Sequence, residues 1–572
     1  MVTPVVVNRS TNPGATQQLI DAGTHPLLAR LMAARGVENS NELASRWADM
    51  LNPNTLSQTQ QAATFLAEAI EEQKRLLIIA DYDCDGATAC AVALRALTEM
   101  GADVDFLVPN RFETGYGLSP AIVSLALQHP NGKPDILITV DNGIASVEGV
   151  EAATSVGIDV VITDHHLPGD ELPKAAAIVN PNHPNCGFLS KNLAGVGVIF
   201  YLMLALRAEL RERGAFDIED QPRLNLLSDL VALGTVADVV KLDSNNRLLV
   251  SQGLKQMRNG HMQAGIAALF EVASRNPANA STFDLGFALG PRINAAGRLA
   301  DMSLGIRCLT TDDPHEARRL AQELEAMNHD RRAIEQTMRD EAMRAVETAT
   351  ANGATKQASL CVYHPDWHQG VVGLVASRLK EKYWRPTLAF ARSDDGSLKG
   401  SGRSVPDVHL RDALDLVSKR DPQLINQFGG HAMAAGLSIA EHNYERFVEL
   451  FDEAVRTLSG RDSFEPVIQT DGSLEVQYLD VSTAALLETQ VWGAGFPAPL
   501  FRDTFNIQQQ RLLKDKHLKL RLERNGSIID AIWFNHNQLL GDQADISYRL
   551  DQNHWNGRVS VQLIIEYALS LS

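Results

Sequence analysis

The sequence predicts an α/β protein of several domains: a parallel-sheet domain, a long connecting helix, a second α/β domain and a C-terminal antiparallel β-barrel. Apolar strand-like runs alternate with helical stretches from Arg75 to Asn182, which is typical of βαβ units. A polar pattern of helical period follows at residues 312–352, and such helices usually bridge domains. After Ser463 polar and apolar residues alternate, as they do in half-buried antiparallel strands.

The elements of the first α/β region have recognisable ends. Residues 1 to about 60 favour short helices without recognisable chemistry, and the strands begin at Arg75. Gly101 ends one helix, while Ser119 suits the N-cap and Pro120 the first turn of the next. The predicted strands are 75–83, 104–110, 135–143, 158–166 and 176–182, and the helices between them are 87–101, 119–129 and 145–157.

The rest of the chain divides into regions that differ in their pattern of polar and apolar residues. Residues 193–240 are helical and largely apolar. A second α/β pattern then combines strands 359–367 and 386–396 with a helix at 370–383 and a glycine-rich turn at 429–436. We therefore expect an N-terminal helical segment (1–60), a first α/β domain (61–240), a linker with the long helix (241–352), a second α/β domain (353–462) and a barrel (463–572).

The composition is ordinary for a globular protein, with 45% hydrophobic and 21% charged residues. The longest apolar stretch, Leu193 to Leu206, is shorter than the about 20 residues of a spanning helix, and no signal-peptide pattern opens the chain. The five cysteines form no CxxC pair. We therefore expect a cytoplasmic protein. Because the net charge is −18, a nucleic-acid site must be a local patch or be assembled around metal ions.

Acidic and imidazole side chains follow three of the predicted strands. Ligands of an open parallel sheet bind outside the carboxyl ends of its strands. Alternate residues of an extended segment face the same way, and carboxylates held that close together need cations to neutralise them. Carboxylates with imidazoles and no thiolate pair favour Mg²⁺ or Mn²⁺. The residues concerned are Asp81, Asp83, Asp85, Asp141, Asp164, His165 and His166.

Each of these residues also has a simpler interpretation. A single aspartate at a strand end is more often a helix N-cap than a metal ligand, and adjacent histidines are commonly surface or core residues. The convergence of three strand ends is what favours a metal site. We interpret Cys84, between two of the carboxylates, as a small buried residue that points away from them.

Four segments together resemble, in order, the four motifs of the DHH phosphoesterases: DYDCDG (81–86), VDNG (140–143), TDHH (163–166) and Asp238 in LGTVADVV. GGHAMAAG (429–436) resembles the marker of that family's second, DHH-associated domain. The segments HPLLARLMAARGV, PRINAAGRLAD, SGRS and WGAGFPAPLF narrow the resemblance to the bacterial single-strand-specific exonucleases, over nearly the whole chain. The resemblance implies that the terminal barrel is of the oligonucleotide-binding (OB) type.

The resemblance also implies a centre of two ions, Mn²⁺ or Mg²⁺. One ion would be held by four side chains and the other by two or three, with one carboxylate shared between them. The first set is Asp85, Asp141, His165 and Asp238, and the second is Asp83 and the shared Asp141, with Asp81 nearby or ligating.

The family pattern assigns the catalytic roles as well. His166 would contact the scissile phosphate, and Asp164 would orient a histidine from behind. No side-chain nucleophile is needed when two ions activate water and neutralise the developing charge. Family pyrophosphatases carry a histidine where this chain has Ile79, so one ion has a protein ligand fewer here.

Several polar residues are candidates for binding phosphate groups. A planar guanidinium suits a terminal phosphate, and a glycine turn can point amides at an anion, although most arginines lie on solvated faces and most glycine turns are only turns. For the 5′-terminal phosphate we favour Arg298 with Arg292 and Asn294. For the scissile phosphate we favour Ser401, Arg403 and His431, and Arg111 is a weaker candidate at the rim.

The barrel region has the local basicity that the whole chain lacks. Between Arg511 and Arg524 six cations stand against two carboxylates. Lys516, Lys519 and Arg521 are candidates to track a single strand, as in OB-type grooves. A solvated amphipathic strand is the alternative, and the resemblance favours binding.

We predict a metal-dependent 5′-to-3′ exonuclease that degrades single-stranded DNA in repair and recombination, with polarity and substrate taken from the resemblance. The implied partners are single-stranded DNA, a single-strand-binding protein and a RecQ-type helicase, with no membrane and a monomeric chain. One alternative is a small-substrate DHH phosphoesterase acting on pyrophosphate, oligoribonucleotides or cyclic dinucleotides, which the barrel and long helix disfavour. Another is a non-catalytic DHH-type DNA-binding scaffold, which the intact motifs disfavour.

Overall fold

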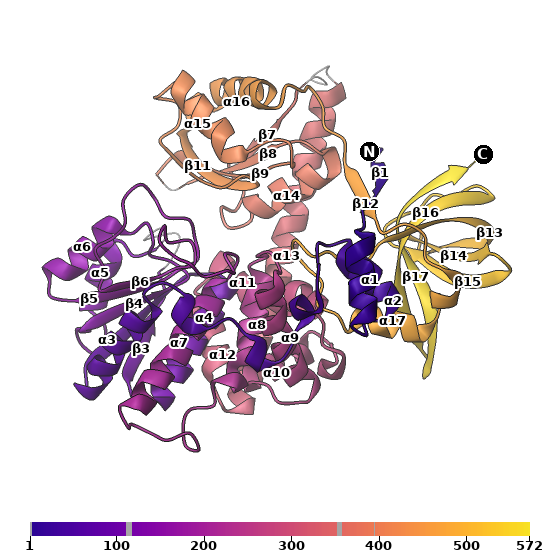
Figure 1. Ribbon diagram of the computed structural model, residues 1–572. Helices are drawn as coiled ribbons and strands as arrows, with labels where there is room; N and C mark the ends of the chain where they lie inside the picture. The colour runs from indigo at the N-terminus through magenta and orange to yellow at the C-terminus, as the bar shows by residue number, and fades with distance from the viewer. Residues whose placement is uncertain (1–2, 110–116, 352–356, 394, 572) are drawn as a thin grey trace. The chain divides into compact units, whose positions relative to one another are not determined.

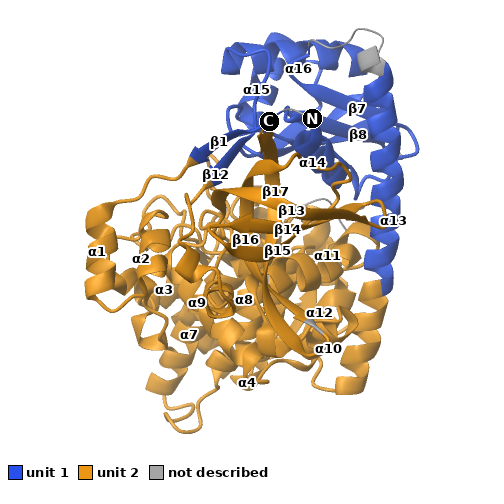
Figure 2. Cartoon of the chain, turned by 90° about the vertical axis from the view of Figure 1, so that its right-hand side faces the viewer, with its two compact units in different colours: residues 1–7, 326–469 blue, residues 8–325, 470–572 orange. Residues whose placement is uncertain are grey.

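The computed structural model describes residues 3–109, 117–351, 357–393 and 395–571; the expected rim residue Arg111 lies outside them. The chain forms two compact units, 1–7 with 326–469 and 8–325 with 470–572 (Figure 2). The boundary between them falls inside the long helix α13 (Pro314–Ala351). Within the described ranges, no helix is both long and apolar enough to span a membrane.

The larger unit contains a five-stranded, wholly parallel sheet in the order β3-β2-β4-β5-β6. Its central strands are buried along almost their whole length, as expected for a sheet covered by helices on both faces. The strands are β2 (Arg75–Ala80), β3 (Asp103–Leu107), β4 (Ile136–Val140), β5 (Asp159–Thr163) and β6 (Ala177–Val179).

Helices cover both faces of this sheet (Figure 1). Leu77 and Ile79 of β2 belong to a core shared with α5 and α6, while α3, α4 and α7 contact strands of the sheet as well. The Ser119 hydroxyl accepts from the Ile122 amide at the start of α5, so the predicted cap is confirmed. These helices are α3 (Thr59–Glu71), α4 (Cys84–Glu99), α5 (Pro120–Leu127), α6 (Val147–Ser155) and α7 (Gly195–Glu212).

Further helices join this domain to α13. The segment expected as a linker contains four α-helices and one π-helix before α13 begins. These helices are α9 (Ser244–Arg258), α10 (Ala264–Val272), the π-helix η6 (Asp284–Leu289), α11 (Gly290–Leu299) and α12 (Ser303–Thr310). Helix α8 (Ser228–Ala237) precedes them.

The smaller unit is built on a mixed five-stranded sheet in the order β10-β11-β9-β8-β7, of which only β7 and β8 run parallel. Its buried core includes Phe390, Phe447 and Phe451. The strands are β7 (Leu360–His364), β8 (Thr387–Arg392), β9 (Ser397–Arg403), β10 (Gln427–Gly430) and β11 (Ala434–Ala440), and the helices are α14 (Val372–Tyr383), α15 (Leu410–Arg420) and α16 (Tyr444–Ser459).

The C-terminal strands close into a barrel in the order β13-β14-β15-β17-β16, and closure removes exposed sheet edges. All neighbouring pairs are antiparallel except β15 with β17. Short α17 (Val481–Glu488) contacts β16 and β17. The strands are β13 (Phe501–Leu513), β14 (His517–Arg524), β15 (Ser527–Trp533), β16 (Gln543–Trp555) and β17 (Arg558–Leu571).

The predicted architecture is confirmed, with one correction at the N-terminus. Besides α1 (Pro13–Asp21) and α2 (Pro26–Ala33), this segment forms strand β1 (Val5–Asn8), which pairs with β12 (Val467–Thr470). The helical expectation failed only at residues 5–8, because β1 is a short edge strand whose partner lies far away in the sequence. Arg35, just after α2, binds Asp471 with two hydrogen bonds of 2.9 Å, so this segment supports the base of the barrel.

Candidate metal centre

The carboxyl ends of neighbouring strands bring the candidate ligands to one level. Ala80, Val140, Thr163 and Val179 are in register across β2, β4, β5 and β6. The next residue of each strand is a polar one, and each is buried: Asp81, Asp141, Asp164 and Asn180.

The loop after β2 and the first turn of α4 supply three carboxylates. Asp83 is the N-cap of α4, and its Oδ1 accepts from the amides of Asp85 and Gly86 at 2.9 and 3.0 Å. Asp83 therefore caps a helix, which is the simpler interpretation of an aspartate at a strand end, and this role is compatible with holding a metal ion. Asp85 is fully buried, and its two oxygens accept from the amides of Gly195 and Val196 at the start of α7. Cys84 is buried, as expected.

Asp141 has an unusual backbone conformation, with φ of 63°. Left-handed backbone is rare outside glycine and costs free energy, so it persists where the surroundings require it. A Cβ atom on Gly195 would lie 2.5 Å from the Asp141 Cβ, so only glycine lets α7 begin this close to the carboxylate.

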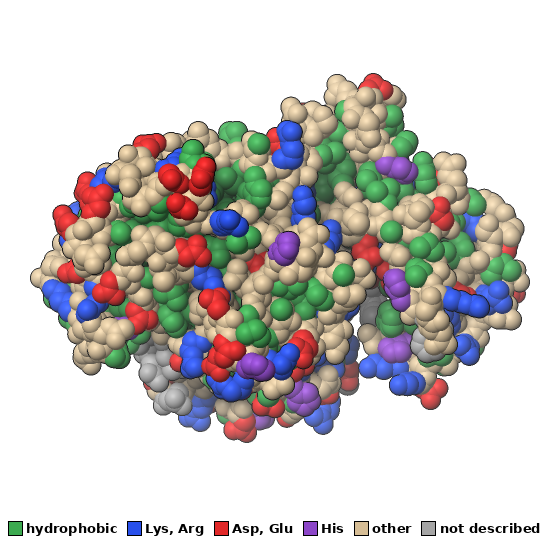
Figure 3. Space-filling view, turned by 90° about the horizontal axis from the view of Figure 1, so that it is seen from below, with side chains coloured by type: hydrophobic (Ala, Val, Ile, Leu, Met, Phe, Trp, Pro, Cys, Tyr) green, Lys and Arg blue, Asp and Glu red, His purple; other side chains and the backbone are tan. Residues whose placement is uncertain are grey.

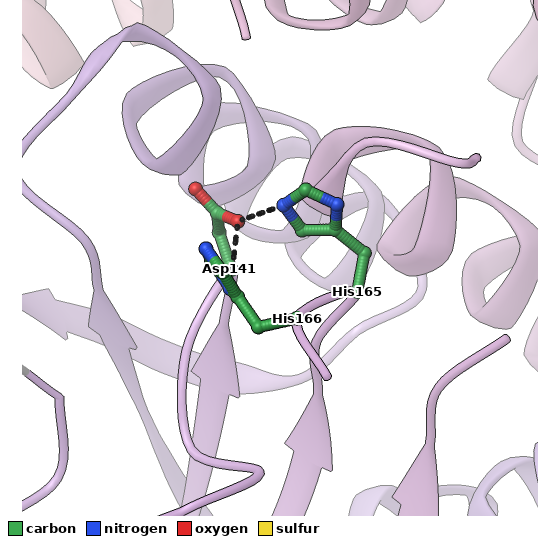
Figure 4. A group of neighbouring side chains, drawn as sticks. All are labelled: Asp141, His165 and His166. Carbon is green, nitrogen blue, oxygen red and sulfur yellow. Dashed lines mark ion pairs between the residues drawn. The ribbon is translucent and has the colours of Figure 1, made fainter. Parts of the chain in front are cut away.

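The two histidines lie on either side of the Asp141 carboxylate (Figure 4). His165 Nε2 lies 3.1 Å and His166 Nδ1 4.0 Å from Asp141 Oδ1. Asp164 accepts from the ring Nδ1 of His166 at 2.7 Å and from three backbone amides, at His165, His166 and Ile144. Asp164 therefore orients His166.

Asp238 completes the cluster from the C-terminal end of α8. Its Oδ2 lies 3.4 Å from His165 Nε2. Within the described residues, ligand atoms form three overlapping groups in which all atoms lie within 4.8 Å of one another. The groups are Asp85 with His165 and Asp238, Asp81 with Asp83 and Asp141, and Asp141 with His165 and His166.

The electrostatics of this cluster favour cations. Burial, followed by repulsion from neighbouring carboxylates, raises the pKa values of Asp81, Asp85 and Asp141 well above their usual range. The same causes raise the pKa of Asp238 to about 7. Burial alone would lower the pKa of His166, but the hydrogen bond to Asp164 and the surrounding carboxylates outweigh it and raise this pKa to about 9.

The donor set fits one or two divalent ions. Oxygen donors predominate, imidazole is the other donor, and no thiolate takes part, which suits Mn²⁺ or Mg²⁺. Two of the groups correspond to the two expected ligand sets. Asp141 belongs to the group with Asp81 and Asp83, and it contacts His165 of the other.

Several supporting residues escaped the sequence analysis. Asn180 and Asn182 donate from their side chains to the backbone carbonyls of His166 and His165, at 3.0 and 2.6 Å. A Cβ atom on Gly234 would lie 2.8 Å from Asp85 Oδ1. The signal for the two asparagines was present in the sequence, because the segment IVNPN is itself the end of a predicted strand.

Helix α11 docks on the acidic loop. A Cβ atom on Gly297 would lie 1.9 Å from the Tyr82 carbonyl oxygen, and Asn294 Oδ1 accepts from the Cys84 amide at 2.8 Å. Arg298, four residues after Asn294, is half-buried. Arg292 instead is buried, with Nε 2.6 Å from Glu325 and Nη1 bonded to the Ala288 carbonyl, an arrangement that favours a packing role.

The smaller unit holds its candidates on neighbouring strands. Arg403 and Ser401 lie on β9, with Arg403 Nη1 3.3 Å from Ser401 Oγ, and burial lowers the Arg403 pKa. Gly373 of α14 approaches both side chains, since a Cβ there would lie 2.9 Å from Ser401 Oγ. His431 is exposed after β10, and its amide donates to the Ala434 carbonyl.

The basic strand of the barrel has the predicted orientation, and a carboxylate of the neighbouring strand lies beside its cations. Leu518, Leu520 and Leu522 of β14 are buried, so Lys519 and Arg521 share the other face. Both approach Asp530 of β15, at 3.7 and 3.9 Å. Lys516 lies exposed in the turn before β14. Acidic and basic side chains are likewise interspersed on the face in Figure 3.

Comparison with known proteins gives one consistent result. Three family models match: the DHH family N-terminal domain at residues 75–235, the DHHA1 domain at 355–457 and the RecJ OB domain at 470–567. The single-stranded-DNA-specific exonucleases RecJ of Haemophilus influenzae and Escherichia coli are 47% and 48% identical, each over 95% of this chain, and 96% and 95% of those proteins are covered. The crystal structure of Thermus thermophilus RecJ with Mn²⁺ matches with a TM-score of 0.80 and 26% identity, over 99% of this chain and 79% of that one.

The parallel sheet with acidic and histidine side chains at its strand ends, followed by the associated domain, defines a DHH phosphoesterase. The chain belongs to the RecJ family of that class, as the full-length identities and the barrel model together establish.

Proposed function

We propose that this protein is a metal-dependent exonuclease that hydrolyses single-stranded DNA from its 5′ end. The observation that carries the proposal is the set of three overlapping ligand groups, two of which contain Asp141, at the ends of three parallel strands and of α8. RecJ relatives named as single-stranded-DNA-specific exonucleases support the substrate. Neither a small-substrate phosphoesterase nor a non-catalytic scaffold is favoured, because the barrel is present and each expected metal-ligand side chain belongs to a group that could hold an ion.

The chain's own residues would divide the chemical work. Two divalent ions would lower the pKa of a bound water and neutralise the charge developing on the phosphate. Asp141 would be shared by both ligand sets, with Asp85, His165 and Asp238 on one side and Asp83, with Asp81, on the other. His166, held by Asp164 and protonated at neutral pH, would donate a hydrogen bond to a phosphate oxygen.

We assign the two phosphate contacts to different helices and strands. The 5′-terminal phosphate would bind Arg298 and Asn294, because α11 docks directly on the acidic loop. The scissile phosphate would be gripped by Arg403, Ser401 and His431 of the smaller unit. The ion pair of the buried Arg292 with the partly exposed Glu325 favours a packing role for that arginine.

The barrel would hold the strand beyond the centre. Lys516, Lys519 and Arg521 lie on the β14–β15 side, the face on which OB-type barrels commonly bind nucleic acid. We further propose that the protein acts as a monomer in the cytoplasm, with a single-strand-binding protein and a RecQ-type helicase supplying its substrate.

The test is digestion of end-labelled oligonucleotides. Single- and double-stranded DNA carrying a label at the 5′ or the 3′ end is incubated with Mn²⁺, Mg²⁺ or EDTA. The proposal expects immediate release of the 5′ label as a mononucleotide or short product, from single strands only and never in EDTA. Degradation from the 3′ end, or turnover in EDTA, would refute it.

A further inference from the structure

An exposed pair of aromatic rings lies on a helix that packs against the end of α8. Phe283 and Phe287 stack with ring centroids 5.0 Å apart and planes 28° from parallel. Their exposed fractions are 48% and 69%, although the π-helix between and around them buries Leu285 and Leu289. Large aromatic side chains ordinarily gain free energy by burial, so a stacked pair held in solvent indicates a surface that contacts something apolar and flat.

The pair is fixed to the helix end that carries a metal-ligand candidate. Cβ atoms on Gly286 and Gly290, on either side of Phe287, would lie 3.4 and 3.2 Å from side-chain atoms of Val236 and Ala237. These are the last residues of α8, and Asp238 follows them directly. The π-helix then runs without a break into α11, which docks on the acidic loop. π-Helical turns occur frequently at functional sites.

The charge beside the pair suits a nucleic acid. Arg275 lies over the Phe283 ring, with Cζ 5.4 Å from the centroid, and it is 3.3 Å from Asp284. A guanidinium next to a solvent-facing aromatic ring can meet a phosphate while the ring meets the base. The helix that carries the pair packs on the end of α8, directly before Asp238, so this surface belongs to the part of the fold that holds a metal-ligand candidate.

We infer that Phe283 and Phe287 form a base-stacking platform for single-stranded DNA as it enters or leaves the metal centre. The inference rests on the proposed function. It assigns to this aromatic pair the contact with the bases, whereas the residues discussed above contact phosphates. Stacking tolerates any base, because every base has a flat face, so the platform grips the strand without reading its sequence.

The test uses a series of 5′-phosphorylated oligonucleotides, each with a single abasic residue at a different position. For the wild type, the abasic residue is expected to lower kcat/KM roughly 5- to 150-fold at one or two positions near the scissile bond. Phe283→Ala and Phe287→Ala should lower kcat/KM on the intact strand by a similar factor, and the abasic residue should then have no further effect. Phe287→Leu keeps apolar area without a flat ring and should behave like Phe287→Ala.

Ile218→Ala is the matched control, because Ile218 is 72% exposed on the loop after α7, and it should match the wild type on every substrate. Equal losses from the abasic residue in the wild type and the phenylalanine variants would overturn the platform. Unchanged hydrolysis of naked DNA by both variants would overturn it as well, in favour of a protein-docking surface. If the wild type leaves single strands intact, the proposed function itself fails, which is a distinct result.

Discussion

His166 and Asp164 form one unit, with Nδ1 of the ring 2.7 Å from Oδ1 of the carboxylate. The Ile144 amide binds the other carboxylate oxygen, so Asp164 is itself held in place. The hydrogen bond to Asp164 raises the pKa of the imidazole and fixes the direction of the ring.

Asp164→Asn should therefore change the pH profile of hydrolysis. Asparagine keeps an acceptor for the amides but removes the charge, so the His166 pKa should fall from about 9 toward its usual 6.5. The protonated ring is then lost at lower pH, and kcat should decline above about pH 7 in the variant. The measurement is kcat from pH 6 to 10 at saturating Mn²⁺, with thermal unfolding as the check on folding. A variant with the wild-type profile would remove the proposed role of His166.

The metal-free centre should weaken the fold as pH rises. A carboxyl whose folded pKa is raised contributes stability at low pH and loses it as pH rises through the folded pKa. For Asp238 that loss runs from about pH 4 to about pH 7, and bound cations should restore it. The increase in melting temperature caused by Mn²⁺, relative to EDTA, should thus be larger at pH 8 than at pH 5.5. Equal increases at both values would contradict a cation site at this cluster.

Removing cations from the barrel and removing a carboxylate from it should change the binding of single strands in opposite directions. Lys519→Gln with Arg521→Gln should weaken binding of long single strands and reduce the steepness of its salt dependence by up to about 1.4. Asp530→Asn should strengthen binding several-fold, because it relieves both cations of their carboxylate neighbour. Glu566→Gln on β17 makes the same charge change beside Arg549 of β16 and serves as the control. Fluorescence anisotropy across a salt series checks these outcomes, and equal effects of Asp530→Asn and Glu566→Gln would argue against a groove on β14.

Arg298→Ala should erase any preference for 5′-phosphate over 5′-hydroxyl ends and leave metal-dependent cleavage. Arg403→Ala should instead lower cleavage of both ends alike. Arg292→Ala is the structural control: it should cost about 1–3 kcal/mol of stability by leaving Glu325 without its buried partner, and should keep the end preference. The ratio of kcat/KM values for the two ends is the quantity to compare. Selective loss of the preference in Arg403→Ala would reverse the two assignments.

The strand ends could be predicted from the sequence because an aspartate directly follows each of three buried apolar runs. Asp81, Asp141 and Asp164 needed only the rule that parallel strands end at one edge. The spacing of the residues in α11 already indicates that the two arginines do not act together. Arg292 and Arg298 are six residues apart, so at 100° per residue they lie on different faces of the helix, whereas Asn294 and Arg298 share one face.

Other features depended on contacts far apart in the sequence. Asp530 lies near Lys519 and Arg521 because of the register between β14 and β15. The turn residues of the sequence alone do not predict that register. Gly195 supports Asp141 across more than fifty residues of chain, and no local pattern marks that approach. The π-helix that presents Phe287 has no simple periodic signature, so the aromatic pair resembled any two core residues of a helix.

We propose that Asp141 is the ligand shared by both ions of a centre that hydrolyses single-stranded DNA. Its most direct test is the rate at which Asp141→Ala and the wild type release the label from 5′-labelled single strands at the same Mn²⁺ concentration. Because removal of a residue that only orients a metal ligand already costs about 10- to 100-fold, loss of the shared ligand should lower the rate by more than about 100-fold while strand binding persists. Wild-type turnover by Asp141→Ala, with the same Mn²⁺ requirement, would contradict the account.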